Sequence, residues 1–534
     1  MGKKTVLGGL FLLAGSLPAQ QPGVDVWQYV FWVDLPDTGS VIHGFTQVLM
    51  GRTPAAGDTV RLDLVGLTVD SVREPPQRHL EYGYDGNTLR VAFGPRRAPV
   101  EEIQVFYHGA PRDGLIFGTN AHQAPTAFGD NWPERARYWV PTVDAPADKA
   151  TVSWVISSPV GPRSVVANGV LRGCEAATAT RRVCRWTEGH PIPAYTMVLG
   201  FALFSVSHHR PVVHGTDTIP IDVWSYPEDS AYADSVPFRR ATEIVETMER
   251  LVAPFPYEKL AHVESSTRYG GMENSTAIFY AERPYVARRM REGVVRHETS
   301  HQWFGDAVTE RSWPHLWLSE GFASYFDLVI GAALDGDSVL TAGLRRDAAT
   351  YFASKVVDRP LVDTAQHDPN QLLNENSYQK GAWVLHMLRG SLGDSGFFQG
   401  IREYYRTYRD STATSEDFEG VMERVTQRDL QSFFTQWLWQ PGYPQLHVVW
   451  RYDAAAHRLR LDLTQVQAAA WGVFRLPRLV IEVPSQDGKV TRRVFSMDGR
   501  SSVAYLEMAT PPTAIRVDPD GRLLLTATVE KGVP

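Results

Sequence analysis

The chain has 534 residues, of which 43% are hydrophobic and 21% are charged. This composition is close to that of ordinary soluble proteins, so it excludes a disordered chain, a collagen-like chain and a long coiled coil. The length predicts about three or four domains. The formal net charge of −7, without a long basic run, argues against a nucleic-acid-binding protein.

Residues 1–20 have the layout of a secretory signal peptide. A positively charged start precedes an apolar run over residues 6–13, and small residues allow cleavage after Ala19 or Gln20. The run is too short to cross a bilayer, which takes ~20 apolar residues, although an uncleaved N-terminal anchor is the alternative. No cysteine follows the run, which argues against a lipoprotein. We expect a mature chain that has no membrane span and is exported to the periplasm or the medium.

The two cysteines, Cys174 and Cys184, flank a short segment that is typical of a hairpin tip. Facing residues of a hairpin come within disulfide range, and an oxidising compartment permits the bond. We expect a disulfide, with two free buried thiols as the alternative.

Between Val26 and about Val206, short apolar runs alternate with turn residues such as Asp85-Gly86-Asn87. This pattern predicts an antiparallel β domain.

Helical spacing follows from Tyr226 to about Trp439. Helix-start signals stand at Ser235-Val236-Pro237 and at Thr414-Ser415-Glu416-Asp417. The last ninety or so residues return to the alternation of strands, and Asp487-Gly488 between two apolar runs predicts a β-hairpin.

A metal-binding pattern lies within the helical block. His297 and His301 are four residues apart, so a helix places both imidazoles on one face, where they can hold one ion. Glu298 stands beside them, within reach of a water molecule on that ion. The alternative is a helix with two ordinary buried histidines.

A catalytic zinc needs a third protein ligand and leaves a position for water. Glu320 is the best candidate, because it begins a second amphipathic helix after enough chain for an antiparallel return. His315 is a rival ligand, but it follows Pro314 in the connecting segment and is less well held there.

Three blocks resemble the zinc aminopeptidase family that includes aminopeptidase N and leukotriene hydrolase, the gluzincins. They are His297-Glu298-x-x-His301 with Glu320, then Tyr269-Gly270-Gly271-Met272-Glu273-Asn274, and Tyr378-Gln379-Lys380-Gly381-Ala382. Weaker matches extend the likeness over nearly the whole mature chain.

The resemblance implies a multidomain α+β fold that agrees with the β–α–β order read from periodicity. After the signal peptide at 1–20 we expect an N-terminal antiparallel β domain over 21–208. A thermolysin-like, mostly helical zinc catalytic domain would cover 209–440, and a C-terminal β-sandwich 441–534. The chain ends about where longer family members begin a large helical domain, so the resemblance implies a short, bacterial-type form.

The resemblance also implies the chemistry of a metalloprotease. One Zn²⁺ per chain would be held by His297, His301 and Glu320, with Glu298 as the general base. The Tyr378 hydroxyl would stabilise the oxyanion of the attacked carbonyl. Without the resemblance, Tyr378 reads as a core tyrosine on an apolar helix.

Glu273 is the residue that distinguishes an exopeptidase from an endopeptidase. Its carboxylate would bind the α-ammonium group of a peptide and so fix the cut after the first residue. Gly270 and Gly271 would let the substrate backbone approach closely, and Met272 and Asn274 complete the substrate-binding motif. A plain turn is the alternative interpretation of this segment.

One position departs from the family pattern. Family members usually carry Gln or Glu five residues before the arginine that matches Arg137, whereas this chain has Trp132 there. Asp130 or Asn131 could take over the binding of the amine, and Trp132 could line or narrow the pocket for the first residue.

The leading hypothesis is an exported zinc aminopeptidase that acts on peptides with a free N-terminus. The alternatives are a gluzincin hydrolase of another specificity (an endopeptidase or an epoxide hydrolase) and a non-catalytic binding protein on the same fold. The sequence indicates neither the preferred first residue, nor the physiological substrate, nor the oligomeric state.

Overall fold

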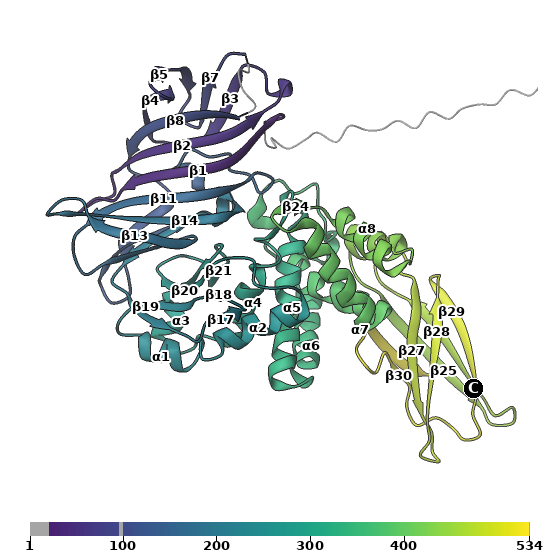
Figure 1. Ribbon diagram of the computed structural model, residues 1–534. Coiled ribbons are helices and arrows are strands. Elements are labelled where there is room, and N and C mark those ends of the chain that lie inside the picture. The colour runs from purple at the N-terminus through teal and green to yellow at the C-terminus, as the bar shows by residue number, and fades with distance from the viewer. Residues whose placement is uncertain (1–20, 96–99, 533–534) are drawn as a thin grey trace, which may run out of the picture.

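The computed structural model describes residues 21–95 and 100–532. A β-rich N-terminal region, a helical middle region and a C-terminal pair of sheets follow one another along the chain (Figure 1). The predicted β–α–β order is therefore confirmed. The predicted signal peptide lies outside the described residues.

The N-terminal region is built on an eight-stranded sheet in the order β13-β14-β11-β1-β2-β8-β4-β5. Its neighbouring strands run antiparallel, apart from the parallel pair β1 and β11. The strands are β1 (Val24–Asp34), β2 (Ile42–Arg52), β4 (Thr68–Glu74), β5 (Arg78–His79), β8 (Val100–Gly109), β11 (Lys149–Pro159), β13 (Val170–Ala176) and β14 (Arg181–Pro193).

Two smaller sheets complete this region. The first has the order β12-β15-β10-β9 and the second the order β3-β7-β6. Their strands are β12 (Ser164–Ala167), β15 (Leu199–Ala202), β10 (Pro125–Asp130), β9 (Gly114–Thr119), β3 (Thr59–Asp63), β7 (Thr88–Ala92) and β6 (Glu81–Tyr84).

Alternating side chains of the large sheet form the N-terminal core. Phe31 packs against Trp154, and the ring of Trp154 stacks on that of Trp139 with centroids 5.4 Å apart. All three side chains are buried, which is where most of the hydrophobic stabilisation of a sheet originates. On the neighbouring strands Cys174 faces Cys184, and the predicted disulfide is present.

The middle region contains a five-stranded sheet in the order β16-β19-β20-β22-β21. Its strands are β16 (Ser205–His208), β19 (Ile221–Ser225), β20 (Leu260–Ser265), β22 (Ala277–Ala281) and β21 (Gly271–Met272). β20 is parallel to both of its neighbours and every residue in it is buried, as expected for a strand covered on both faces. β21 is the short antiparallel strand at one edge.

Helices α4 (Glu292–His301), α5 (Trp317–Asp335), α6 (Ser338–Ala353) and α7 (Gly381–Tyr408) follow the sheet. Gly321 of α5 and Gly381 of α7 let two backbones approach closely, because a Cβ on Gly321 would lie 2.9 Å from the Cα of Gly381. The other helices are α1 (Ser230–Ser235), α2 (Ala241–Leu251), α3 (Glu282–Val286), α8 (Ser415–Thr426) and α9 (Gln431–Phe434).

One predicted helix start is confirmed and the other is wrong. Thr414 and Asp417 form a capping box at the start of α8, as their spacing predicts. Ser235, by contrast, ends α1, and α2 begins only at Ala241. The residue before a proline is disfavoured in helical conformation, and Val236, which precedes Pro237, leaves the helix with φ −120° and ψ −80°.

The C-terminal region consists of a four-stranded sheet, β29-β26-β25-β31, and a three-stranded sheet, β28-β27-β30. The strands are β25 (Gln445–Asp453), β26 (Arg458–Gln465), β27 (Leu476–Pro484), β28 (Val490–Met497), β29 (Ser501–Glu507), β30 (Arg516–Val517) and β31 (Thr526–Lys531). β27 and β28 form the predicted hairpin around Asp487-Gly488. No helix of the described residues is long and apolar enough to span a membrane.

Candidate metal centre

Helix α4 places two imidazoles and a carboxylate together. With 3.6 residues per turn, His297 and His301 share one face, and their Nε2 atoms lie 3.1 Å apart. One possible ligand atom from each of His297, Glu298 and His301 fits within a group whose members all lie within 4.8 Å of one another. The local sequence spacing therefore produces the cluster directly.

Glu320 reaches this cluster from the first turn of α5. Its Oε2 atom lies 3.2 Å from His297 Nε2 and 3.4 Å from His301 Nε2. Ligand atoms bound ~2.0–2.1 Å from a tetrahedral zinc ion lie about 3.3 Å apart. The three atoms therefore have the spacing of a zinc ligand set, and two imidazoles with one carboxylate suit zinc chemically.

A carbonyl group behind His301 fixes the tautomer of its ring. The Nδ1 atom lies 3.2 Å from the carbonyl oxygen of Phe304, which can only accept a hydrogen bond. Nδ1 therefore carries a proton, and Nε2 is the nitrogen that faces the cluster and would bind a metal there. The rival His315 lies outside this group of ligand atoms, and its Nδ1 forms a hydrogen bond with Ser415 Oγ at 2.8 Å.

The charges around the cluster favour a cation. Burial lowers the pKa of His301, but the carboxylates of Glu273 and Glu320 outweigh burial and raise that pKa to about 10. Burial raises the pKa of Glu320, but hydrogen bonds from His297 and His301 hold it well below its usual range. Buried carboxylates thus recruit positive charge at this point, and a divalent ion supplies it.

Tyr378 and Glu298 complete the cluster. The Tyr378 hydroxyl donates to Glu320 Oε1 at 2.7 Å, and its ring stacks on that of His297 with centroids 6.0 Å apart. Tyr378 lies in η7 (Asn376–Lys380), a π-helical turn of the kind often found at functional sites. Burial raises the pKa of Glu298, a shift that suits a group required to accept and release a proton.

The segment around β21 brings Glu273 to the same place. Gln302, the neighbour of His301, donates to the Glu273 carbonyl at 3.0 Å and so joins this segment to α4. Gly271 packs so closely on Glu298 that a Cβ would overlap its carboxylate, whereas a Cβ on Gly270 would meet no atom within 4 Å. Burial raises the pKa of Glu273 to about 7. The charge of His301 lowers this pKa, whereas the charges of Glu320 and Glu298 raise it.

The remaining residues of this motif are interior. Met272 is buried in β21, and Asn274 is fully buried, with no hydrogen-bond partner for its side-chain amide among the described residues. The structure therefore leaves Gly270 and Gly271 as the residues of this segment that a ligand backbone can approach.

A cavity of about 590 Å³ adjoins the cluster. His297, Glu298 and Tyr378 contribute to its wall, and helices α4, α5 and α6 supply most of the rest. Charged side chains of both signs line it, among them Arg291, Arg346, Asp327 and Asp347. The cluster is thus accessible to a ligand of appreciable size.

The sequence around this cluster matches a known protein family. Residues 238–437, which include the two histidines, Glu298, Glu320, Glu273 and Tyr378, match the Peptidase family M1 domain. This part of the chain is therefore similar to the M1 peptidase domain. The resemblance read from the three sequence blocks is confirmed.

Known proteins resemble the sequence of this chain at low identity. "Probable aminopeptidase 2" of Sulfurisphaera tokodaii is 25% identical over 452 residues, covering 80% of this chain and 55% of that protein. "Tricorn protease-interacting factor F2" of Thermoplasma acidophilum is 26% identical over 456 residues, covering 80% of this chain and 54% of that protein. The chain thus spans about half the length of the curated relatives it matches.

Solved structures share the fold. Legionella pneumophila aminopeptidase A, crystallised in complex with aspartic acid, superposes with a TM-score of 0.82 at 17% identity, over 96% of this chain and 60% of that one. An M1 zinc metallopeptidase from Deinococcus radiodurans superposes with a TM-score of 0.68 at 24% identity, over 79% of this chain and 95% of that one. The predicted multidomain fold is confirmed.

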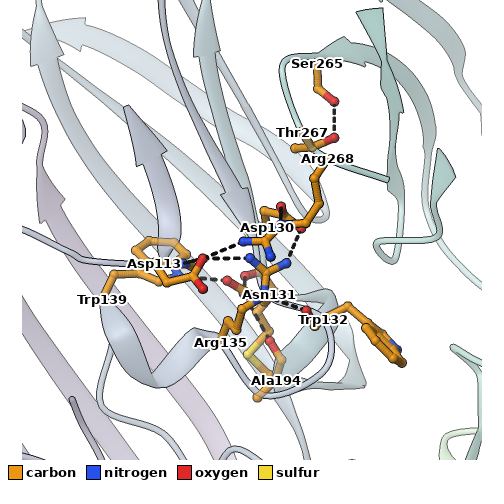
Figure 2. A network of polar contacts seen from close by, with 12 residues as sticks. Asp113, Asp130, Asn131, Trp132, Arg135, Trp139, Ala194, Ser265, Thr267 and Arg268 are labelled. Atoms are coloured by element: carbon orange, nitrogen blue, oxygen red, sulfur yellow. Dashed lines mark hydrogen bonds and ion pairs between the residues drawn. The ribbon is translucent and has the colours of Figure 1, made fainter. Parts of the chain in front are cut away.

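The structure gives Asp130 and Asn131 other roles than amine binding. Asp130 is paired with Arg135 at 2.6 Å, and Asn131 donates to the Met197 carbonyl at 2.6 Å (Figure 2). Both side chains are thus held by contacts within the protein. Trp132 is buried, and its ring packs against the rings of Tyr269 and Trp313.

Glu310 is a buried acidic residue of the matched segment that the sequence analysis did not single out. It is buried at the end of β23 (Val308–Glu310), and neither carboxylate oxygen has a hydrogen-bond partner among the described residues. Burial raises its pKa well above the usual range, and the charges of Glu273 and Glu320 raise it further. No motif marks this position in the sequence, where Glu310 follows Val308 and Thr309.

Proposed function

We propose that this protein is a zinc aminopeptidase, which hydrolyses the peptide bond after the first residue of a peptide. The observation that carries the proposal is the convergence of three ligand atoms, from His297, His301 and Glu320, within 3.1–3.4 Å of one another. Glu298 and Tyr378 border the same point, and Glu273 lies next to it.

The ligand set would hold one zinc ion per chain. When bound, zinc lowers the pKa of a coordinated water molecule to ~7 and polarises the carbonyl under attack. Glu298, the buried carboxylate beside the two histidines, takes the proton of the attacking water and passes it to the leaving amine. The Tyr378 hydroxyl, whose one proton faces Glu320 Oε1, would give up that hydrogen bond and donate to the carbonyl oxygen as negative charge develops there.

Glu273 would select substrates with a free N-terminus. The α-ammonium group of a peptide has a pKa of roughly 7.7–8.0 and is largely charged at neutral pH. A buried carboxylate within electrostatic reach of Glu320 and Glu298 gains stability by pairing with it. The exposed edge at Gly270 and Gly271 lets the substrate backbone lie alongside β21.

A paired substrate test decides between the candidate activities. We expect a leucine anilide with a free amine to be cleaved and its N-acetylated form to resist, because only the free form presents the ammonium to Glu273. Equal cleavage of both would favour an endopeptidase, and cleavage of neither, across a broad panel and with zinc loaded, would favour a binding protein. Glu298→Gln should retain zinc and lose nearly all turnover.

We also propose that the mature protein is exported. The layout of residues 1–20 supports export, and a disulfide between Cys174 and Cys184 is typical of an oxidising compartment. The test is the N-terminal peptide of the protein recovered from the periplasm or the medium of a secreting host. Cleavage after Ala19 or Gln20 is expected, and an intact N-terminus on cytoplasmic protein would contradict the proposal.

A further inference from the structure

Strand β21 is too short to fix its own position. It pairs with β22 through two residue pairs only, Gly271 with Tyr280 and Met272 with Phe279. Its distance from the catalytic base is nevertheless set narrowly, since Gly271 packs directly on the carboxylate of Glu298. The preceding loop, residues 266–270, is tied to its own sheet where the Gly270 carbonyl accepts from Ala281 N at 3.2 Å, and it has further anchors outside that sheet.

Those anchors belong to the N-terminal β region. Ser266 Oγ lies 3.0 Å from Thr126 Oγ1 of β10. The ring of Tyr269 packs edge-on against Trp132, with centroids 5.8 Å apart. Between them Arg268 extends its guanidinium group toward two aspartates of the same region, at the start of β9 and the end of β10.

Arg268 takes part in a network of four charges (Figure 2). Its Nη2 donates to Asp113 Oδ1 at 3.0 Å, and its Nε lies 3.3 Å from Asp130 Oδ2. Arg135 bridges the same two carboxylates, at 2.7 Å from Asp113 and 2.6 Å from Asp130. Two aspartates and two arginines thus alternate, and their formal charges cancel.

The network also holds Trp132. Arg135 Nε donates to the Trp132 carbonyl oxygen at 2.7 Å, and the indole ring points away from the ion pairs. The Arg135 guanidinium group lies 6.0 Å from the ring centroid of Tyr269. Arg135 therefore contacts both Trp132 of the N-terminal region and Tyr269 of the loop.

The geometry favours an arginine at position 268. Asp130 is almost fully buried, at 1% exposure, so its charge depends on donors supplied by the protein. Two separate N–H groups of Arg268 face two different carboxylates, which a planar guanidinium group can do and a lysine ammonium on a flexible stem does less well.

We propose that Arg268 is a positioning residue for the peptide-binding edge: through Asp113 and Asp130 it fastens the loop before β21 to the N-terminal β region and so sets the place of Gly270 and Gly271. The inference rests on the proposed function, because it concerns the same substrate site. Among the described residues, the polar contacts of Arg268 are with Asp113 and Asp130. Its loss would loosen the loop without pressing Gly271 onto the Glu298 carboxylate, so we expect the effect to fall on binding of the substrate backbone.

The test compares Arg268→Met with Arg288→Met. Arg288 is a matched control, since its side chain is 48% exposed against 52% for Arg268 and it pairs at 2.7 Å with another buried aspartate, Asp229. For a leucine anilide we expect Arg268→Met to raise KM roughly tenfold, the effect of losing one charge-assisted hydrogen bond, with kcat within about twofold of the native value. Arg268→Lys should give an intermediate KM.

Hydrogen exchange of the zinc-loaded protein supplies a readout that does not depend on activity. We expect faster exchange of the amides from Thr267 to Met272 in Arg268→Met, but not in Arg288→Met. Unchanged exchange in this segment, or faster exchange with a native KM, would overturn the inference. If the native protein cleaved no peptide, the proposed function would fail, and exchange would still decide whether Arg268 anchors the loop.

Discussion

A methyl group added at Gly271 should remove most of the activity. The Cβ of Gly271→Ala would lie 2.7 Å from Glu298 Cγ and nearer still to the carboxylate, whereas ordinary contacts measure 3.4–4 Å. Relief requires that either β21 or the Glu298 side chain moves by about 1 Å. Because a misplacement of ~1 Å can cost about 100-fold in rate, we expect kcat to fall by about that factor.

The matched control for this prediction is the neighbouring glycine. A Cβ on Gly270 would meet no atom within 4 Å, so Gly270→Ala should keep kcat within a fewfold of the native value. The assay is the steady-state hydrolysis of a leucine anilide, with zinc content and melting temperature measured on both variants. Equal kcat values for the two alanine variants, with equal zinc contents, would refute the close packing of β21 on the catalytic base.

Three further predictions concern the metal, acid stability and the disulfide. His301→Gln should lose stoichiometric zinc while His315→Gln retains it, since only His301 joins the cluster; metal analysis of the dialysed proteins checks this. Burial lowers the pKa of His262 to about 3, and the charge of His209 adds to the effect. Below pH ~6.5 the unfolded state therefore binds a proton that the folded state does not, and the free energy of unfolding falls as the pH is lowered toward 3. In His262→Leu, urea titrations at successive pH values should show a shallower fall, by the contribution of about one proton. Reducing Cys174–Cys184 should lower the free energy of unfolding by at most about 3 kcal/mol in the chain-entropy model, and a protein whose urea midpoint is insensitive to reductant would contradict this.

Local patterns carried most of what the sequence predicted correctly. The alternation around Asp487-Gly488 and the capping residues Thr414 and Asp417 each act within a few residues, and the structure has the hairpin and the helix start where they indicate. The four-residue spacing of His297 and His301 likewise needs only a helix to bring the imidazoles together. The start proposed at Ser235 failed because the following proline terminates one helix rather than opening another.

Contacts between distant segments could not be read from spacing. Asp113, Asp130 and Arg268 come together only when the loop before β21 meets the end of β10, so nothing local marks them as a network. Glu310 belongs to the same class, because the charge of Glu273 raises its pKa from a distant part of the sequence. Glu320 combines the two cases. The sequence predicted that it begins a helix, but its approach to the histidines depends on how α5 packs on α4.

The most direct test of the account is anomalous diffraction at the zinc edge from crystals of the metal-loaded protein. The account predicts one strong peak per chain, at ~2.0–2.2 Å from His297 Nε2, His301 Nε2 and a Glu320 carboxylate oxygen. A map without a peak there, or with its zinc bound by other residues, would contradict it.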